Sequence, residues 1–277
     1  MNAFHASLEE LLAAGPPPLL RLAEVVRGCV ESATPCALRE SLPALEACAL
    51  AGEKEDPPAA AALWQSLGRL YQAAADFPAA RNALEHSLSL ADVPSTRLHL
   101  AALLRELGEL AAAEVLFEAA WAGLEHQGGA SLSERLEGLI ERGLLRQEQG
   151  RPAEALQSLQ EARELAEAHL TPADPLLATT LNHLGTMERD LSQLEAAIQH
   201  HRQALALDEA HRGPLHPATA RDANDLAVAL LSAGELSEAR SLVERALEID
   251  RTAFGERHPA TARDLANQGE ILRAQGD

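Results

Sequence analysis

Histidine and cysteine are the residue types in this chain that are best suited to metal binding or nucleophilic catalysis. His200 and His201 are adjacent, and His183 lies on the preceding expected helix. No two histidines have the HxxxH or HExxH spacing that places two ring nitrogens on one helix face for zinc. The three cysteines lie within residues 29–48 and form no CxxC pair. The sequence therefore predicts structural or solvated histidines and free, mostly buried thiols.

Other catalytic signatures are absent from the sequence. The chain carries no GxSxG motif, no glycine-rich loop that would cradle a phosphate, and no pair of carboxylates at the end of an expected strand. Its acidic residues recur on the expected exposed faces of helices, which is the usual pattern of solvated charge. The sequence predicts a protein that is not an enzyme and that needs no cofactor and no metal ion.

Asparagine recurs at a regular spacing in the C-terminal half. Asn182 and Asn224 are 42 residues apart, and Asn267 lies one place beyond the next such interval. Each amide side chain carries two donors and an acceptor, so a column of amides can bond the backbone of an extended peptide without reading its side chains. Two other interpretations stay open: a solvated polar residue, or an amide that bonds across to the next helix pair.

The elements that would position these residues are helical hairpins. Trp64, Leu67, Gly68 and Tyr71 are spaced so that they share one face of a helix. Gly68 costs about 1 kcal/mol relative to Ala in a helix interior, which is tolerable where a second backbone must approach closely. Ala80 supplies a matching small surface on the following helix. This stretch predicts one helix, a tight turn, and a second helix that folds back on the first.

The hairpin signature recurs along the chain. The first turn is at Ala75, and the second follows 33 residues later. That second turn is at Gly108, and the later turns follow at intervals of 42 residues, at Gly150, Ser192, Gly234 and Gly276. Such periodicity predicts a repeat array in which each unit packs mainly on its neighbours.

The periodicity gives an expected division into three parts. Residues 1–58 form an N-terminal helical cap or degenerate repeat, with helices at about 1–15, 17–31 and within 36–51. Residues 59–258 form five helix pairs, and residues 259–277 form a C-terminal capping helix. The expected pairs are 60–74 with 77–91, 95–107 with 110–125, 131–149 with 152–168, 175–190 with 193–208, and 217–233 with 236–252. The remaining helix is expected at about 259–275.

The hairpin motif Trp-x2-Leu-Gly-x2-Tyr resembles the tetratricopeptide repeat. The segments from Glu195 to Ala218 and from Glu238 to Ala262 look like the 42-residue repeats of kinesin light chain and its bacterial relatives. The resemblance covers roughly residues 60–277. It implies an all-α fold, a right-handed superhelical solenoid of antiparallel helix pairs, in which the first helix of each pair lines a concave surface.

The same resemblance implies a peptide-binding groove on that concave surface. In it the asparagines would bond a peptide backbone, the arginines would pair with an acidic residue or terminal carboxylate, and Val228 would line a shallow pocket. The predicted groove residues are Asn182, His183, Arg189, Arg221, Asn224, Asp225, Val228, Arg263 and Asn267.

Composition and charge limit the partners further. The net charge is −19, from 23 basic and 42 acidic residues, which disfavours nucleic acid and anionic membrane surfaces. No apolar run reaches the ~18 residues needed to span a bilayer. Residues 1–15 carry two glutamates and no basic residue, unlike a secretory signal, so a cytoplasmic location is expected. With 3% aromatic residues and abundant Leu and Ala, helices rather than strands are expected to carry the burial.

These features predict a non-enzymatic scaffold that binds a peptide or helical segment of a partner protein in its concave groove. An alternative of a different class stays open: a regulatory or inhibitory subunit, or a substrate, of a bacterial effector system such as a caspase-like protease or a signalling ATPase. The high Ala, Leu and Arg content suggests a GC-rich bacterial genome.

Overall fold

The computed structural model describes residues 11, 18–31, 41–126, 130–171 and 174–276, and every regular element in them is a helix. The helix expected over residues 1–15, residue 11 aside, and Cys36 lie outside the described residues. The chain divides into two compact units, Met1–Ala130 (unit 1) and Ser131–Asp277 (unit 2). The expected all-helical fold is confirmed, and the division after residue 130 was not anticipated.

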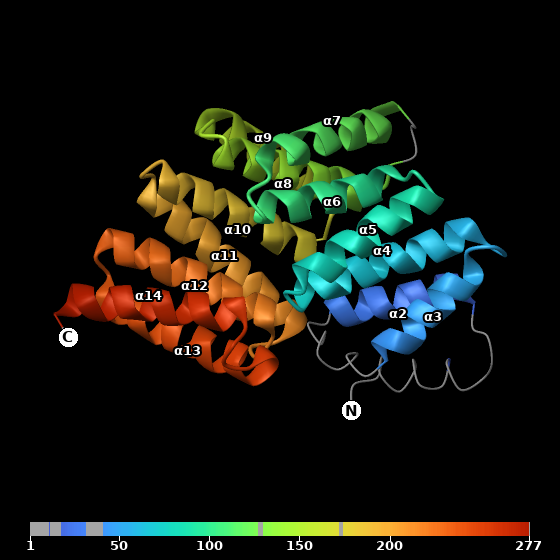
Figure 1. Cartoon of the computed structure of the whole chain (residues 1–277). Coiled ribbons are helices and arrows are strands. Elements are labelled where there is room, and N and C mark those ends of the chain that lie inside the picture. The colour runs from blue at the N-terminus through green and yellow to red at the C-terminus, as the bar shows by residue number, and fades with distance from the viewer. Residues whose placement is uncertain (1–10, 12–17, 32–40, 127–129, 172–173, 277) are drawn as a thin grey trace. The chain divides into compact units, whose positions relative to one another are not determined.

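The described part of unit 1 contains two helical hairpins and, before them, the helices α2 and α3. Helices α4 and α5 form one hairpin and α6 and α7 the next, while α2 packs along α4 and makes few contacts with α3 (Figure 1). Pro43 lies in the first turn of α3, as predicted, where its missing N–H costs nothing. The helices are α2 (Leu19–Glu31), α3 (Leu42–Gly52), α4 (Pro57–Ala73), α5 (Phe77–Leu90), α6 (Pro94–Glu106) and α7 (Leu110–His126).

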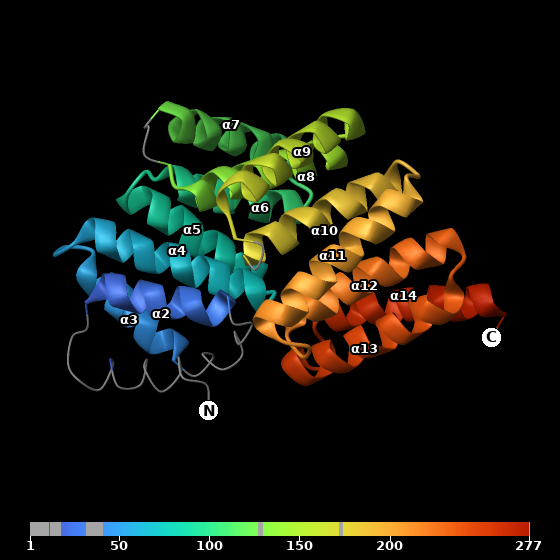
Figure 2. The same ribbon diagram turned by 180° about the vertical axis from the view of Figure 1, so that it is seen from behind.

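Unit 2 is a stack of three hairpins and a final helix. Each hairpin packs on the next, and α14 packs on α13 and α12 (Figures 1 and 2). The bounds agree with the expected pairs to within a few residues, and α11 and α13 run longer than expected. The helices are α8 (Leu132–Glu148), α9 (Pro152–His169), α10 (Pro175–Asp190), α11 (Leu194–Arg212), α12 (Pro217–Ala233), α13 (Leu236–Phe254) and α14 (Pro259–Gln275).

The predicted turns are confirmed by their backbone geometry. Each hairpin reverses direction at a residue in the left-handed region, where glycine carries no steric penalty. Two of these residues are not glycine: Ala75 has φ 59° and Ser192 has φ 62°. The glycine turns are Gly108, Gly150, Gly234 and Gly276, with φ between 73° and 88°.

The expected close approach at Gly68 is also confirmed. A Cβ atom placed on Gly68 would lie 2.6 Å from Cγ of Leu84 and 3.4 Å from the carbonyl oxygen of Ala80 on α5. Gly143 meets Leu159 on α9 in the same way, at 2.8 Å. The two helices of these hairpins therefore touch where the first helix has no side chain, and larger residues there would push them apart.

Helix α14 differs from the earlier first helices in one respect. Leu265 is 39% exposed, whereas Ala223, one repeat earlier on α12, is fully buried under α13. A Cβ atom on Gly269 would meet nothing within 4 Å. The cap role of residues 259–277, like that of residues 1–58, stays a prediction.

Gly143 and Gly269 offer a matched test of the close-approach constraint. Gly143→Ala is expected to lower the free energy of unfolding of unit 2 by about 1–2 kcal/mol, because overpacking against Leu159 exceeds the gain in helix propensity. Gly269→Ala is expected to raise it by about 0.5–1 kcal/mol, because only the helix-propensity gain remains. Urea denaturation followed by circular dichroism measures both; equal effects of the two substitutions would contradict the constraint.

Candidate functional site

The first helices of unit 2 form the tighter of its two layers. Helices α8, α10, α12 and α14 contact one another in sequence. The second helices α11 and α13 are bridged by long side chains instead, through the ion pairs Arg202–Glu238 (3.0 Å) and Arg245–Glu209. The first helices are therefore close together, whereas the second helices are farther apart and are joined by long side chains. This difference curves the stack of unit 2, and the first helices lie on the inner side of the curve.

The first helices are linked by a recurring hydrogen bond between buried and half-exposed amide or carboxylate groups. Asn182 of α10 donates from Nδ2 to the Asp225 carboxylate of α12 at 2.7 Å, and Asn267 of α14 donates to the Asn224 amide oxygen at 3.0 Å. Only 2% of Asn182 and 1% of Asn224 is exposed. Of the interpretations open for these asparagines, the structure shows the one in which they bond across to the next helix pair.

The same bond occurs in unit 1. There the Gln65 amide of α4 lies 2.9 Å from Nδ1 of His99 on α6, and these residues occupy the repeat positions of Asn182 and Asp225. The partners differ in chemistry, but each pair joins successive first helices through short polar side chains. We call this recurring contact the inner ladder.

His201 of α11 holds Asn182 from the other side. Its Nδ1 lies 2.7 Å from the Asn182 amide oxygen, so this nitrogen donates. The ring is fully buried and fills the space left by Gly185, where a Cβ atom would lie 2.9 Å from it. Burial lowers the pKa of His201 to about 4, so the imidazole is neutral at pH 7. For His201 the predicted structural role is confirmed.

The three arginines predicted for the groove already have counter-ions within the chain. Each guanidinium pairs with the aspartate that follows it in sequence, at 2.8–2.9 Å. These pairs are Arg189–Asp190, Arg221–Asp222 and Arg263–Asp264. A carboxylate from a partner would therefore have to share or displace an internal one.

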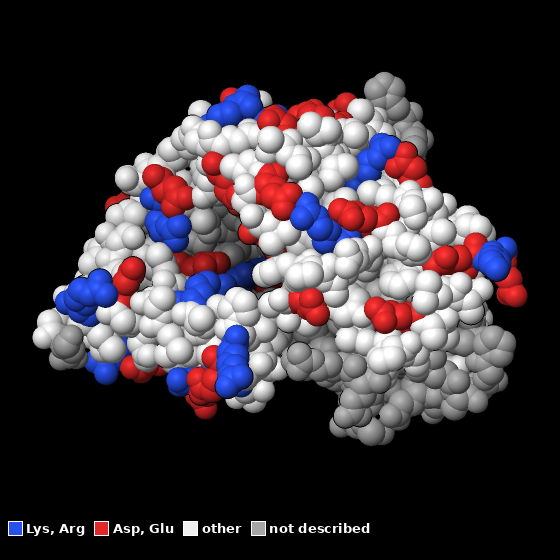
Figure 3. Space-filling view, viewed as in Figure 1, with Lys and Arg blue, Asp and Glu red and all other residues white. Residues whose placement is uncertain are grey.

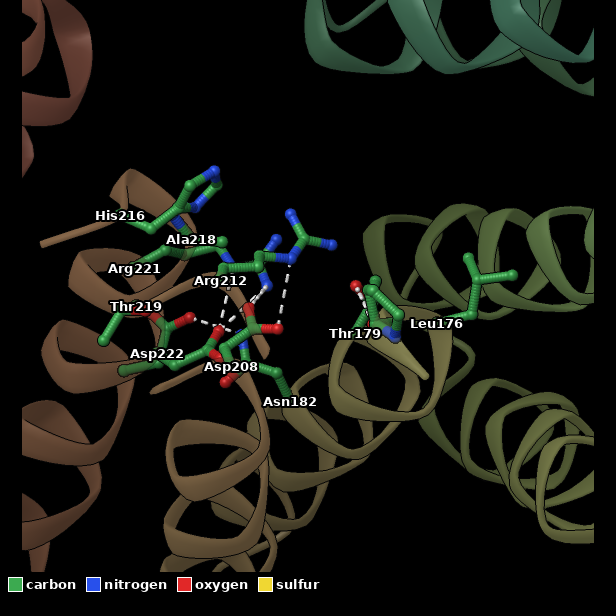
Figure 4. Close-up of polar contacts among 12 residues, drawn as sticks. Leu176, Thr179, Asn182, Asp208, Arg212, His216, Ala218, Thr219, Arg221 and Asp222 are labelled. Atoms are coloured by element: carbon green, nitrogen blue, oxygen red, sulfur yellow. Dashed lines mark hydrogen bonds and ion pairs between the residues drawn. The ribbon is translucent and has the colours of Figure 1, made fainter. Parts of the chain in front are cut away.

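Two pairs of buried aspartates lie behind these arginines. Asp208, at the end of α11, faces Asp222, near the start of α12, and Arg212 and Arg221 point toward them (Figure 4). One repeat later Asp250 of α13 and Asp264 of α14 occupy the same places. All four are between 0% and 1% exposed. The prediction that acidic residues lie on exposed faces is wrong for them.

The carboxyl groups of Asp222 and Asp250 are harder to ionise than an exposed aspartate. The pKa of Asp222 is raised to about 7, mainly by burial; the positive charge of Arg221 opposes the shift and the negative charge of Asp208 adds to it. Burial and the charge of Asp264 likewise raise the pKa of Asp250 to about 7. Near neutral pH Asp222 and Asp250 are therefore partly protonated, which offsets part of the cost of burying their carboxyl groups.

The helix starts place these aspartates. His216 caps α12: its Nδ1 accepts the backbone N–H of Ala218 at 3.0 Å. Thr219 donates to the carbonyl oxygen of Gly213 at 2.9 Å (Figure 4). His258 and Thr261 do the same at the start of α14. The interpretation of His-Pro as a feature of repeat boundaries is confirmed, and the cap fixes the rotation of the helix that carries Asp222.

The predicted groove residues therefore fall into three groups. Asn182, Asn224, Asp225 and Asn267 form the inner ladder; Arg189, Arg221 and Arg263 form internal ion pairs; His183 and Val228 are half-exposed side chains on the inner face. The buried aspartates were missed, although a signal existed: Asp208 and Asp250 are 42 residues apart, as are the Arg-Asp dipeptides 221–222 and 263–264.

Comparison with known families decides the classification. Family models described as tetratricopeptide repeat match residues 95–126 and, in two overlapping stretches, residues 176–252 and 224–277. The chain is a tetratricopeptide repeat protein. No curated protein matches its sequence.

Solved structures share the fold of this tetratricopeptide repeat protein. BtubC from P. vanneervenii is 22% identical over 80% of this chain and 84% of its own, with a TM-score of 0.56. A kinesin light chain-like protein of Podosopora anserina is 21% identical over 66% and 88%, with a TM-score of 0.54. NprR, solved with its cognate peptide NprX, is 16% identical over 92% and 78%, with a TM-score of 0.65. The predicted kinesin light chain-like repeat type is confirmed at the level of fold.

The surface gives two further observations. On the face seen in Figure 3, basic side chains lie beside acidic ones rather than in one basic patch. Among the described helices, none combines the length and the apolar character required to cross a membrane.

The buried amide of Asn182 provides a test of the inner ladder. Asn182→Ala leaves Asp225 and the donor nitrogen of His201 without their partner and is expected to cost about 1–3 kcal/mol of stability. The exposed amide of Gln199 on α11 makes no hydrogen bond in the structure, so Gln199→Ala is expected to stay within about 0.5 kcal/mol of the parent. Urea unfolding of the two variants measures the change in the free energy of unfolding. An equally small decrease for Asn182→Ala would show that the inner ladder does not stabilise unit 2.

The aspartate pairs predict a particular dependence of stability on pH. The folded-state pKa of Asp222 is raised, so its contribution is fully present below its ordinary pKa and is lost as the pH rises toward 7. Asp222→Asn removes this loss. The free energy of unfolding of the variant relative to the parent is therefore expected to rise by about 2 kcal/mol between pH 5 and pH 8.

Urea titrations at several pH values measure this difference. Glu248→Gln, at an exposed position of α13, serves as the control and should follow the parent at each pH. A constant difference between Asp222→Asn and the parent over the same range would mean that Asp222 titrates alike in the folded and unfolded states.

Proposed function

We propose that this tetratricopeptide repeat protein is a scaffold that binds a segment of another protein along the inner face of unit 2. One observation carries the proposal: the inner face combines half-exposed apolar and polar side chains on helices whose relative positions are fixed by buried bonds. Val228 and Leu231 of α12 are half-exposed beside Asp225, and His183 and Thr186 are half-exposed on α10. A rigid, mixed surface of this kind suits an extended or helical segment.

The inner ladder changes the roles that we propose for the groove residues. Asn182 and Asn224 are buried, so in this proposal they position the helices rather than provide the first contacts. The half-exposed ladder members Asp225 and Asn267 supply a carboxylate and an amide to a bound backbone, and Val228 supplies an apolar contact. The arginines act as secondary contacts, because each already pairs with an aspartate.

A related fold supports the proposal by analogy. NprR, a solved structure with a TM-score of 0.65 to this chain, holds its cognate peptide NprX. The alternative role, as a regulatory subunit or substrate of an effector system, stays a prediction, as do the absence of enzymatic activity, the cytoplasmic location and the bacterial origin. Binding along the inner face is common to both roles.

The test uses peptides selected for binding to the chain. A phage-displayed peptide library is panned on the intact protein, and the dissociation constants of enriched peptides are measured by fluorescence anisotropy. Val228→Glu is expected to weaken these peptides at least tenfold, because it places a charge in the centre of the apolar contact. Ser241→Glu adds the same charge at an exposed position of α13 and is expected to leave affinity unchanged.

Two results would overturn the proposal. One is enrichment of peptides whose affinity is unaffected by Val228→Glu, which would move binding away from the inner face. The other is an equal loss of affinity for both glutamate variants, which would make the effect one of net charge. Melting curves of the two variants verify that each remains folded.

A further inference from the structure

Unit 1 contains a pocket of its own. It has a volume of about 320 Å³, which is at the lower end of the ~300–1,000 Å³ typical of ligand sites. Its lining comes from three helices: Glu46 and Leu50 from α3, Trp64 and Tyr71 from α4, and Asn82 and His86 from α5. Leu50 is 56% exposed, so the pocket has an accessible apolar edge.

Aromatic groups form one side of the pocket and bond to two carboxylates: Glu46, which lines the pocket, and Glu53, which does not line it but bonds to Trp64 and His86. The indole of Trp64 meets the ring of His86 edge-to-face, with centroids 5.0 Å apart. Trp64 Nε1 donates to Glu53 at 3.3 Å, and His86 Nε2 lies 2.7 Å from the same carboxylate oxygen. Tyr71 donates its hydroxyl to Glu46 at 2.6 Å. The acidic groups are therefore positioned by neutral or weakly basic donors.

The negative charge of this site is not balanced by arginine or lysine in the part of the chain that the structure describes. Glu46 makes no ion pair there, and Glu53 pairs only with His86. Each carboxylate can accept further hydrogen bonds, because it has about four lone-pair sites. The amide of Asn82 is exposed, and no hydrogen bond within the described residues engages it. Acceptors thus outnumber donors around an apolar wall.

We propose that this pocket binds a primary alkylammonium group, the side chain of a lysine on a partner protein. An anionic ligand would be repelled by Glu46 and Glu53, and a neutral one would cover the Glu46 carboxylate without supplying a counter-charge. The methylene groups of lysine fit against Leu50 and the aromatic wall, and its three N–H donors reach separate acceptors. The net charge of −19 favours the approach of a cationic partner.

Ammonium fits better than guanidinium. Arginine binds best where both oxygens of one carboxylate are free for two parallel bonds. Glu46, the carboxylate in the lining of this pocket, already accepts a bond from Tyr71, and the other lining acceptor is the amide oxygen of Asn82. The remaining acceptor sites belong to different residues, and a compact point charge with rotatable donors matches that arrangement.

The indole N–H signal of Trp64 gives a direct readout, because Trp64 lines the pocket and its N–H donates to the neighbouring Glu53. The chain has two tryptophans, so Trp121→Phe assigns the signal in a proton–nitrogen correlation spectrum. Nα-acetyl-lysine N-methylamide is titrated at constant ionic strength, with Nα-acetyl-norleucine N-methylamide as the matched probe without the ammonium group. The lysine probe is expected to shift the Trp64 signal saturably, and the norleucine probe is expected not to.

Substitutions test whether the Glu46 carboxylate is needed for binding of the lysine probe. Glu46→Gln keeps an acceptor for Tyr71 and is expected to weaken the lysine probe at least tenfold. Glu55→Gln changes an exposed glutamate that does not line the pocket and is expected to leave the affinity unchanged. Melting curves verify that both variants fold as the parent does.

Four outcomes would overturn the proposal. The first is no saturable shift with the lysine probe, and the second is an equal shift with norleucine. The third is an equal loss of affinity in Glu46→Gln and Glu55→Gln, which would show a general effect of charge. A fourth arm uses n-butylammonium: tighter binding than the lysine probe would overturn the assignment to a protein side chain in favour of a free amine.

Discussion

The structure depends on the close crossing of two helices at a position without a side chain. Gly68, Gly143 and Gly185 let the first helix of their hairpins lie against the second, and Leu84, Leu159 and His201 fill the resulting space. Protein interiors are packed too densely to absorb an extra methyl group there without a shift of the neighbour. In the other two hairpins a buried alanine, Ala101 or Ala227, occupies the equivalent position. Because a small residue recurs there, successive hairpins stack in a similar way and bring equivalent residues into register.

The register is what turns isolated polar residues into an ordered inner face. Asn182, Asn224 and Gln65 each meet a polar group one repeat later and one position further along, which joins the first helices at short range. Arginine–glutamate pairs such as Arg202–Glu238 join the second helices at long range. Curvature and the spacing of the half-exposed side chains follow from this difference in reach. The shape of the surface proposed to bind a partner therefore depends on the hydrogen bonds between the first helices and on the ion pairs between the second helices.

The buried aspartate pairs add a cost to the same interfaces. A buried carboxyl group stabilises the fold only where charge and hydrogen bonds compensate its lost hydration. Asp208 with Asp222, and Asp250 with Asp264, have arginines on one side, and burial raises the pKa of Asp222 and that of Asp250 to about 7. The histidine and threonine caps of α12 and α14 set the rotation of the two helices that carry Asp222 and Asp264. These interfaces are consequently specific in register and sensitive to pH.

The sequence by itself determined the helices, their turns and the close contact at Gly68. These features depend on local geometry: helix bounds follow from caps and turns within a few residues, and even the non-glycine turn residues Ala75 and Ser192 are identified by the period. The repeat family was also predictable, since a motif and a period repeated along the chain leave few alternatives.

Only the tertiary structure decided which way the polar side chains at the edge of the inner face point. Asn182 and Asn224 lie on the boundary between the groove and the neighbouring helix, and whether such a group is free or buried depends on how near that helix comes. The same holds for Asp222 and Asp264, which were expected, like the other acidic residues, on exposed helix faces. Burial is set by distances between helices, and these arise from packing summed over many residues rather than from the local sequence.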